Sequence, residues 1–208
     1  MKAPSRRPAR TPAARRAPGP AATLLALLTL SGCAWHGGGF PGGAVEGPRR
    51  DDKAFGPACP QVAPGTANAA ALEKTSVLAA IRSMPQLSEL TALVKEAKAE
   101  DMFRSMQNVT VFAPTDAAFD KLTEQRRKAI AEPGKAGDTV RSLIVAQDLT
   151  REDLAAGQAY PTLQDGVQVR SATTAGGGVA VDGAEVVCGS VTTKDARLHL
   201  LDALPAEG

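Results

Sequence analysis

The side chains that could carry out catalysis or bind a metal are few in this chain. It contains two histidines, His36 and His199, and three cysteines. An enzyme needs a base beside a nucleophile, or ligands clustered around a metal, and no Cys-x-x-Cys, His-x-x-x-His or Gly-x-Ser-x-Gly spacing occurs. Only carboxylate chemistry remains, and helix capping or solvation accounts for Asp116, Asp120 and Asp202. We therefore expect no enzyme activity, no cofactor and no metal site.

Cys33 is the residue most clearly placed for covalent modification. The 32 residues before it carry basic side chains and no acidic one, and an apolar stretch runs over 21–30. That stretch is too short for a transmembrane helix, which needs about 20 apolar residues, but it suits a signal peptide. The Leu-Ser-Gly-Cys sequence at its end resembles the bacterial lipobox, in which the cysteine receives a diacylglycerol and becomes the first residue after cleavage.

We therefore predict a lipoprotein signal peptide over 1–32 and lipidation of Cys33. The protein would then be exported and held on the outer face of the cell membrane by its acyl chains. The alternative is an ordinary secreted protein in which Cys33 is incidental. Residues 33–65 are rich in glycine and proline and have no apolar period, which is typical of a linker. The domain itself is predicted over 66–205.

The distribution of charge argues against a nucleic-acid partner. Six of the 24 basic residues lie within 1–32, so the chain from Cys33 onward carries 18 basic and 22 acidic residues. A net-acidic domain lacks the surface that neutralises phosphates.

Helical periodicity dominates the first half of the predicted domain. It predicts helices over 69–84, 88–106, 124–132 and 138–147, the last with Asp138 as N-cap. An apolar run over 109–113 predicts a strand that Pro114 ends. Thr115 then suits the N-cap of a further helix, and the Thr-Arg-Glu-Asp sequence from Thr150 resembles a capping box.

After Tyr160 the apolar period changes from 3.6 residues to 2. Asp165-Gly166 and Asp182-Gly183 are hairpin-type turns between the short apolar runs. Helices followed by an antiparallel sheet indicate the α+β class.

Two sequence boxes resemble the signatures of the fasciclin-like (FAS1) family. The first is Asn-Val-Thr-Val-Phe-Ala-Pro-Thr-Asp-Ala-Ala-Phe over 108–119, and the second is His-Leu-Leu-Asp over 199–202. The segment 181–189 is similar in particular to small secreted and lipid-anchored actinobacterial members. The resemblance implies a wedge-shaped antiparallel β-sandwich with flanking helices, used for adhesion or ligand binding at cell surfaces.

The residues of these boxes are expected to act structurally, through core packing, helix capping and, at His199, a buried hydrogen bond. They are Thr110, Phe112, Ala113, Pro114, Thr115, Asp116, Phe119, His199 and Asp202. Two family features are missing: a central Tyr-His pair falls on Ser142-Leu143, and an Asp-Ile element tied to integrin binding falls near Ser190-Val191. Integrin binding through that element is therefore not expected.

Cys59 and Cys188 form an even pair if Cys33 is consumed by lipid. Export into an oxidising compartment and the bridged relatives in the family favour a disulfide between them. The alternative is two free buried thiols.

The leading hypothesis is a non-catalytic adhesion or binding module, anchored to the membrane by lipid, whose ligand is a surface protein, a polysaccharide or a lipid. The alternative is a carrier of a lipid or small ligand, which would need an apolar pocket of about 300–1,000 Å³.

Overall fold

The computed structural model describes residues 52–62 and 66–205. The predicted signal peptide, Cys33 and most of the predicted linker lie outside the described residues. The helices, in chain order, are α1 (Cys59–Val62), α2 (Thr66–Leu72), α3 (Val77–Ser83), a 3-10 turn η1 (Pro85–Leu87), α4 (Ser88–Glu96), α5 (Glu100–Ser105), α6 (Asp116–Asp120), α7 (Glu124–Ala131), α8 (Lys135–Ser142) and α9 (Arg151–Ala155). The strands are β1 (Val109–Pro114), β2 (Ile144–Val145), β3 (Ala159–Pro161), β4 (Gln168–Thr173), β5 (Val179–Val181), β6 (Ala184–Thr192) and β7 (Ala196–Leu201).

The strands form one curled, mixed sheet in the order β2-β1-β7-β6-β5-β4-β3. All neighbours are antiparallel except β1 and β7, which pair in parallel with Val111 opposite Leu198. An isolated bridge between Val145 and Thr162 connects the two ends of the sheet. The α+β class is confirmed, and the expected antiparallel sheet is corrected to a mixed one. β1 and β7 are joined through most of the domain rather than by a hairpin, so no tight turn forces them to be antiparallel.

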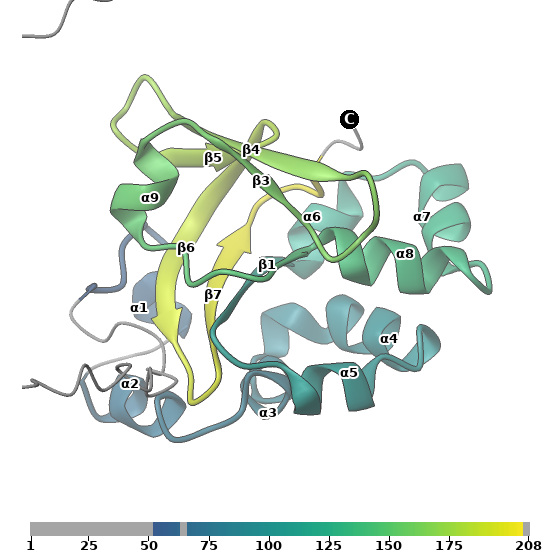
Figure 1. The fold of residues 1–208 in the computed structure, drawn as a ribbon, viewed down its shortest axis with the longest axis horizontal. Helices are drawn as coiled ribbons and strands as arrows, with labels where there is room; N and C mark the ends of the chain where they lie inside the picture. The colour runs from purple at the N-terminus through teal and green to yellow at the C-terminus, as the bar shows by residue number, and fades with distance from the viewer. Residues whose placement is uncertain (1–51, 63–65, 206–208) are drawn as a thin grey trace, which may run out of the picture. The chain divides into compact units, whose positions relative to one another are not determined.

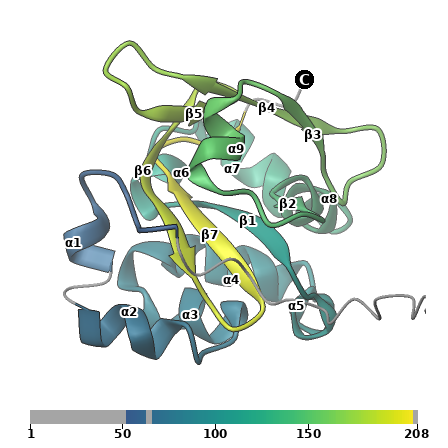
Figure 2. The same cartoon turned by 60° about the vertical axis from the view of Figure 1, so that its left-hand side comes forward.

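The curled sheet separates two apolar clusters. The face of β1, β7 and β6 that lies away from β3, β4 and β5 is covered by α3, α4 and α5 (Figure 1, Figure 2). Val109, Val111 and Ala113 point into this helix-covered cluster, whereas Phe112 points into the cluster enclosed by the sheet. Successive side chains alternate between the faces of a strand, and both faces of β1 are buried. The continuous apolar run of the first signature box is the consequence.

Two predicted long helices are each broken in the structure. The helix expected over 69–84 is interrupted between α2 and α3, where the Ser76 hydroxyl accepts from the Ala79 amide and the buried Asp195 carboxylate accepts from the Val77 amide at 2.8 Å. The helix expected over 88–106 stops at Glu96, and Lys98 has a positive φ of 50°. The start of α3 is fixed in part by Asp195, which lies 118 positions further along the chain, and the second break contains a residue with positive φ. Helical periodicity alone reveals neither feature.

The region around Asp138 also differs from the prediction. Helix α8 begins at Lys135 after Gly134 and ends at Ser142, so Asp138 lies inside it, where its carboxylate pairs with Arg141. The residues after it form β2, which pairs with β1. By contrast, Thr150 and Asp153 form the predicted capping box at the start of α9.

Residues 52–62, which we call the N-terminal strap, pack against β6. Phe55 bridges Gly189, and the Ala58 amide donates to the Val187 carbonyl at 2.9 Å. The contacts of the domain therefore begin upstream of residue 66, inside the segment assigned to the linker from composition.

Candidate functional site

The first signature box holds the end of β1 and the start of α6 in place. The Thr110 hydroxyl donates to the Gln147 carbonyl at 2.7 Å and accepts from the Leu149 amide at 2.8 Å. The Thr115 hydroxyl and amide both donate to the Leu201 carbonyl, at 3.1 and 3.0 Å. These bonds connect β1 to the chain after β2 and to the end of β7, so the polar residues of the box join elements that are far apart in sequence.

Asp116 caps a helix other than its own. Its carboxylate accepts from the Glu89 amide at 2.9 Å and from the Ser88 hydroxyl at 2.7 Å, both at the start of α4. This satisfies an amide that the helix leaves unpaired and places negative charge at its positive end. Ala113, Pro114 and Phe119 are buried.

Asp202, the last residue of the second box, also has a structural set of partners. Its carboxylate accepts from the Glu185 amide at 2.6 Å and from Lys121 Nζ at 2.8 Å. Burial raises the pKa of this carboxyl, but the hydrogen bonds from Lys121 and Glu185 lower it more, and the net pKa lies below the ordinary value. The group is thus ionised and joins α6 to the ends of β6 and β7.

His199 is fully buried in β7 between two hydrogen-bond partners. Its Nε2–H donates to the Leu149 carbonyl at 2.9 Å, and its Nδ1 accepts from the Ser190 amide at 3.3 Å. A neutral imidazole therefore makes a hydrogen bond at each of its two ring nitrogens. Burial lowers the pKa of His199 to about 4, and the nearby Arg197 lowers it further against the opposing effect of the Leu149 carbonyl. A neutral, enclosed imidazole acts here as a connector between β7, β6 and the segment before α9.

The depressed pKa of His199 predicts a loss of stability in mild acid. Between pH 6.5 and about 4 the unfolded chain binds a proton at this residue and the folded chain does not. The free energy of unfolding therefore decreases as the pH falls through this window, by about 3 kcal/mol. Urea unfolding at pH 7, 6, 5 and 4 measures it. His199→Gln should lose this part of the pH dependence and His36→Gln should keep it; an unchanged slope in His199→Gln would contradict the assignment.

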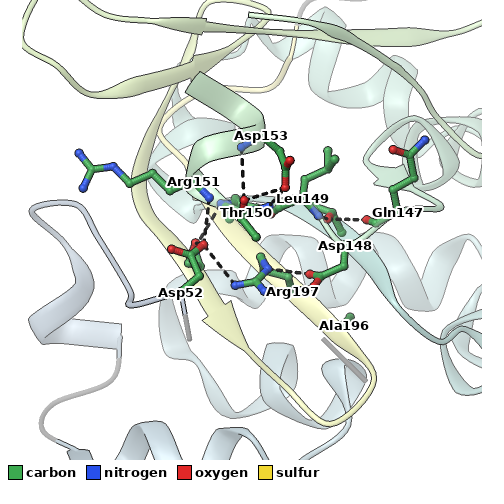
Figure 3. Close-up of polar contacts among 12 residues, drawn as sticks. Asp52, Gln147, Asp148, Leu149, Thr150, Arg151, Asp153, Ala196 and Arg197 are labelled. Carbon is green, nitrogen blue, oxygen red and sulfur yellow. Dashed lines mark hydrogen bonds and ion pairs between the residues drawn. The ribbon is translucent and has the colours of Figure 1, made fainter. Parts of the chain in front are cut away.

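Arg197 is the centre of a buried ion-pair cluster that the sequence analysis missed (Figure 3). Its side chain has no exposed area, and its guanidinium binds Asp148 through two hydrogen bonds, at 2.7 and 3.1 Å. A third contact, at 3.4 Å, joins Arg197 to Asp52 of the strap. Asp52 also accepts from the Ser190 hydroxyl and the Arg151 amide. The signal in the sequence is an arginine within the Ala-Arg-Leu-His-Leu-Leu strand, in which His199 is the other polar residue.

Cys59 and Cys188 are joined by a disulfide with their Cα atoms 4.8 Å apart. The bridge connects α1 to β6, as expected from the sequence. It therefore holds the strap against the domain covalently, next to the hydrogen bonds at Phe55 and Ala58.

The two positions at which family features are missing have other roles in the fold. The Ser142 hydroxyl donates to the Thr139 carbonyl, and the carbonyl of the buried Leu143 accepts from the Phe112 amide at 2.9 Å. Ser190 and Val191 are 2% and 4% exposed. The stretch that would correspond to the integrin element is consequently inside the protein.

The described surface contains hollows of modest size. One of about 230 Å³ lies between α4, α6 and α7, over Leu93, Phe119 and Ile130. A larger one of about 360 Å³ lies beside η1 and mixes apolar walls with Gln61, Asn68, Thr75 and Gln86. No group of three or more His, Cys, Asp or Glu residues in 52–62 and 66–205 is arranged to hold a metal ion. None of the described helices is long and apolar enough to cross a membrane.

This architecture, with its two boxes buried at the junctions of sheet and helices, defines a FAS1-type domain. A model of the fasciclin domain matches residues 85–204. The chain belongs to the fasciclin domain family.

The chain is also similar to mycobacterial proteins, in agreement with the expected likeness to actinobacterial members. It is 31% identical over 178 residues to the immunogenic protein MPB70 of Mycobacterium bovis and to the immunogenic protein MPT70 of Mycobacterium tuberculosis, covering 77% of this chain and 86% of each relative. Among solved structures, a FAS1 domain pair from the insect cell adhesion molecule fasciclin I matches with a TM-score of 0.54 and 21% identity, over 64% of this chain. The match covers 51% of the length of that pair, and at this identity the likeness concerns the fold.

Proposed function

We propose that this chain is an exported lipoprotein, anchored through Cys33, that displays a non-catalytic FAS1 domain as an adhesion or binding module on the outer face of the membrane. The observation that carries the proposal is that the polar side chains of the signature boxes make hydrogen bonds to other parts of the fold. Asp116, His199 and Asp202 each hold a structural hydrogen bond within the fold. A base that is buried and already hydrogen-bonded at both nitrogens is poorly suited to proton transfer with a substrate.

The interior also favours a module that binds at its surface over a carrier that encloses its ligand. Phe112, Val169 and Leu201 fill the space within the curled sheet, where a carrier of a similar fold would have its pocket. The hollow over α4, of about 230 Å³, is smaller than the pocket of about 300–1,000 Å³ that a carrier would need. The hollow beside η1, of about 360 Å³, reaches the lower end of that range, but polar side chains such as Gln61 and Asn68 form part of its wall. The ligand on this reading is a surface protein, a polysaccharide or a lipid headgroup of the cell envelope.

Removing the proposed anchor should release the protein from membranes. Cys33→Ala removes the residue that would carry the acyl chains, so we expect the protein to move from the membrane fraction to the aqueous fraction. The protein with Cys33 should stay in the membrane fraction, because a diacylglycerol and a further acyl chain hold a protein far more firmly than a single chain. Cell fractionation with a high-salt wash measures this. Ser31→Ala, which keeps a small residue in the lipobox, serves as the control and should remain in the membrane fraction. Sedimentation of Cys33→Ala with membranes after the wash would show that the anchor is elsewhere.

The released Cys33→Ala protein is also the reagent for the binding half of the proposal. Three immobilised probes test it: purified envelope polysaccharide, vesicles of the cell's own phospholipids, and the protease-accessible surface proteins. Saturable binding to one of them supports a surface module. Binding to none, together with co-purification of a stoichiometric small molecule, would favour the carrier.

A further inference from the structure

The N-terminal strap is attached to β6 along its whole length. Upstream of Cys59, the Phe55 amide donates to the Gly189 carbonyl at 3.1 Å, and the Gly189 amide donates to the Phe55 carbonyl at 2.7 Å. Figure 2 shows α1 at the flank of β6, on the side away from α7 and α8. The strap thus adds an antiparallel bridge to β6, beyond the short stretch where β5 pairs with that strand.

The position of β6 on which the strap packs is occupied by a glycine. A Cβ atom at Gly189 would lie 2.3 Å from the Phe55 ring, so only glycine allows the ring to rest on β6 there. The Arg151 guanidinium lies over the same ring, with its central carbon 4.8 Å from the ring centre. A cation over an aromatic face is attracted by the ring. The strap is therefore held by side chains as well as by backbone hydrogen bonds.

Each end of the strap has its own attachment. At the upstream end, Asp52 binds Ser190, Arg151 and the buried Arg197. Near the downstream end, the disulfide joins Cys59 to Cys188 of β6, which pairs with β7 and β5 on the two sides. The covalent link is thus made to an interior strand of the sheet, and it spans 129 residues of sequence.

The segment that follows the strap exposes most of the side chains that the structure describes in it. In α2, Asn68, Ala69, Ala70 and Ala71 are exposed and Leu72 is only half-buried. A short helix with little buried surface has low local stability. Tension on the N-terminal side would unravel α2 first if the strap were not fixed to β6.

We infer that the strap and its disulfide form a mechanical clamp, through which tension on the N-terminal side enters the domain at β6 and bypasses the helices α2 to α5. The source of the tension, a membrane anchor on one side and a bound ligand on the other, rests on the proposed function. The clamp itself depends only on the contacts between the strap and β6. Under load, the bridge at Phe55 opens before the covalent link, and the link then passes the force to Cys188.

Single-molecule stretching of the full chain, held at its two ends, tests the clamp. In the oxidised protein the 129-residue loop stays closed, so complete unfolding should give a final length shorter by about 430–460 Å than in Cys59→Ser/Cys188→Ser. The double-serine variant should also begin to unfold at a lower force, with an early release of the strap and α2. Equal starting forces in the two proteins would overturn the clamp.

A second variant keeps the test decisive if the double-serine protein does not fold. Phe55→Ala removes the ring that rests on β6 and lies under the Arg151 guanidinium, and it leaves the disulfide and the contacts of Asp52 intact. Its strap should open at a lower force, while the main unfolding event keeps its wild-type force because the disulfide carries the load. If the force of the main unfolding event decreased together with the force at which the strap opens, the inference would be contradicted. Neither result depends on lipid at Cys33, so failure of the clamp and failure of the anchor are distinguishable.

Discussion

Phe112→Ala should lower the free energy of unfolding by about 3–5 kcal/mol, because the ring is fully buried and its removal leaves a cavity as well as losing apolar transfer energy. The ring is part of the cluster enclosed by the sheet, where it contacts the aromatic face of His199 with ring centres 5.8 Å apart. A loss of this size approaches the total stability of a small domain.

Chemical denaturation followed by circular dichroism measures the effect. Phe112→Leu is the matched variant that keeps most of the volume and should cost less than the alanine. Gln125→Ala, on the exposed face of α7, should change stability by no more than about 0.5 kcal/mol. A wild-type free energy of unfolding for Phe112→Ala would place the ring at the surface, where it could contact a ligand.

Asp148→Leu should also lower the free energy of unfolding by about 3–5 kcal/mol, because it removes the carboxylate that makes two hydrogen bonds with the buried Arg197. The contact of the Arg197 guanidinium to Asp52 is longer, at 3.4 Å, than either of the two hydrogen bonds to Asp148. Taking away one partner of a buried pair costs more than the pair contributes, because a charge is left without compensation in a poorly solvated site.

A double-mutant cycle separates the pair from its surroundings. Arg197→Met/Asp148→Leu should recover a large part of the loss, so that the two single changes add up to more than the double change by at least about 1 kcal/mol. Asp52→Asn, at the more exposed end of the cluster, should cost less than Asp148→Leu. Additive single effects would show that Asp148 and Arg197 stabilise the fold independently.

Local chemistry in the sequence predicted the elements that are fixed by neighbouring residues. The apolar run around Phe112 forms a strand, and every residue of that strand is buried. The capping box at Thr150 starts α9. The disulfide was predictable from the cysteine count together with the resemblance. Each of these features depends on residue types within a few positions or on a family motif.

The features that the sequence did not reveal are those set by distant partners. A capping role was expected for Asp116, but the helix that its carboxylate caps is α4, which meets α6 in space and lies earlier in the chain. The parallel pairing of β1 with β7 and the Arg197 cluster likewise join residues that are far apart along the chain. The strap was included in a linker because its composition resembles one, although Asp52 and Phe55 contact β6.

Mass spectrometry of the intact protein, extracted from its native membranes in detergent, tests the central claim most directly. The account predicts a chain that begins at Cys33, carries a diacylglycerol on that residue, and has the two-proton deficit of one disulfide between Cys59 and Cys188. Treatment with a lipase should remove the fatty acyl mass and shift the protein to the aqueous phase. A mature chain that begins at another residue, or an unmodified Cys33 at its start, would contradict the account.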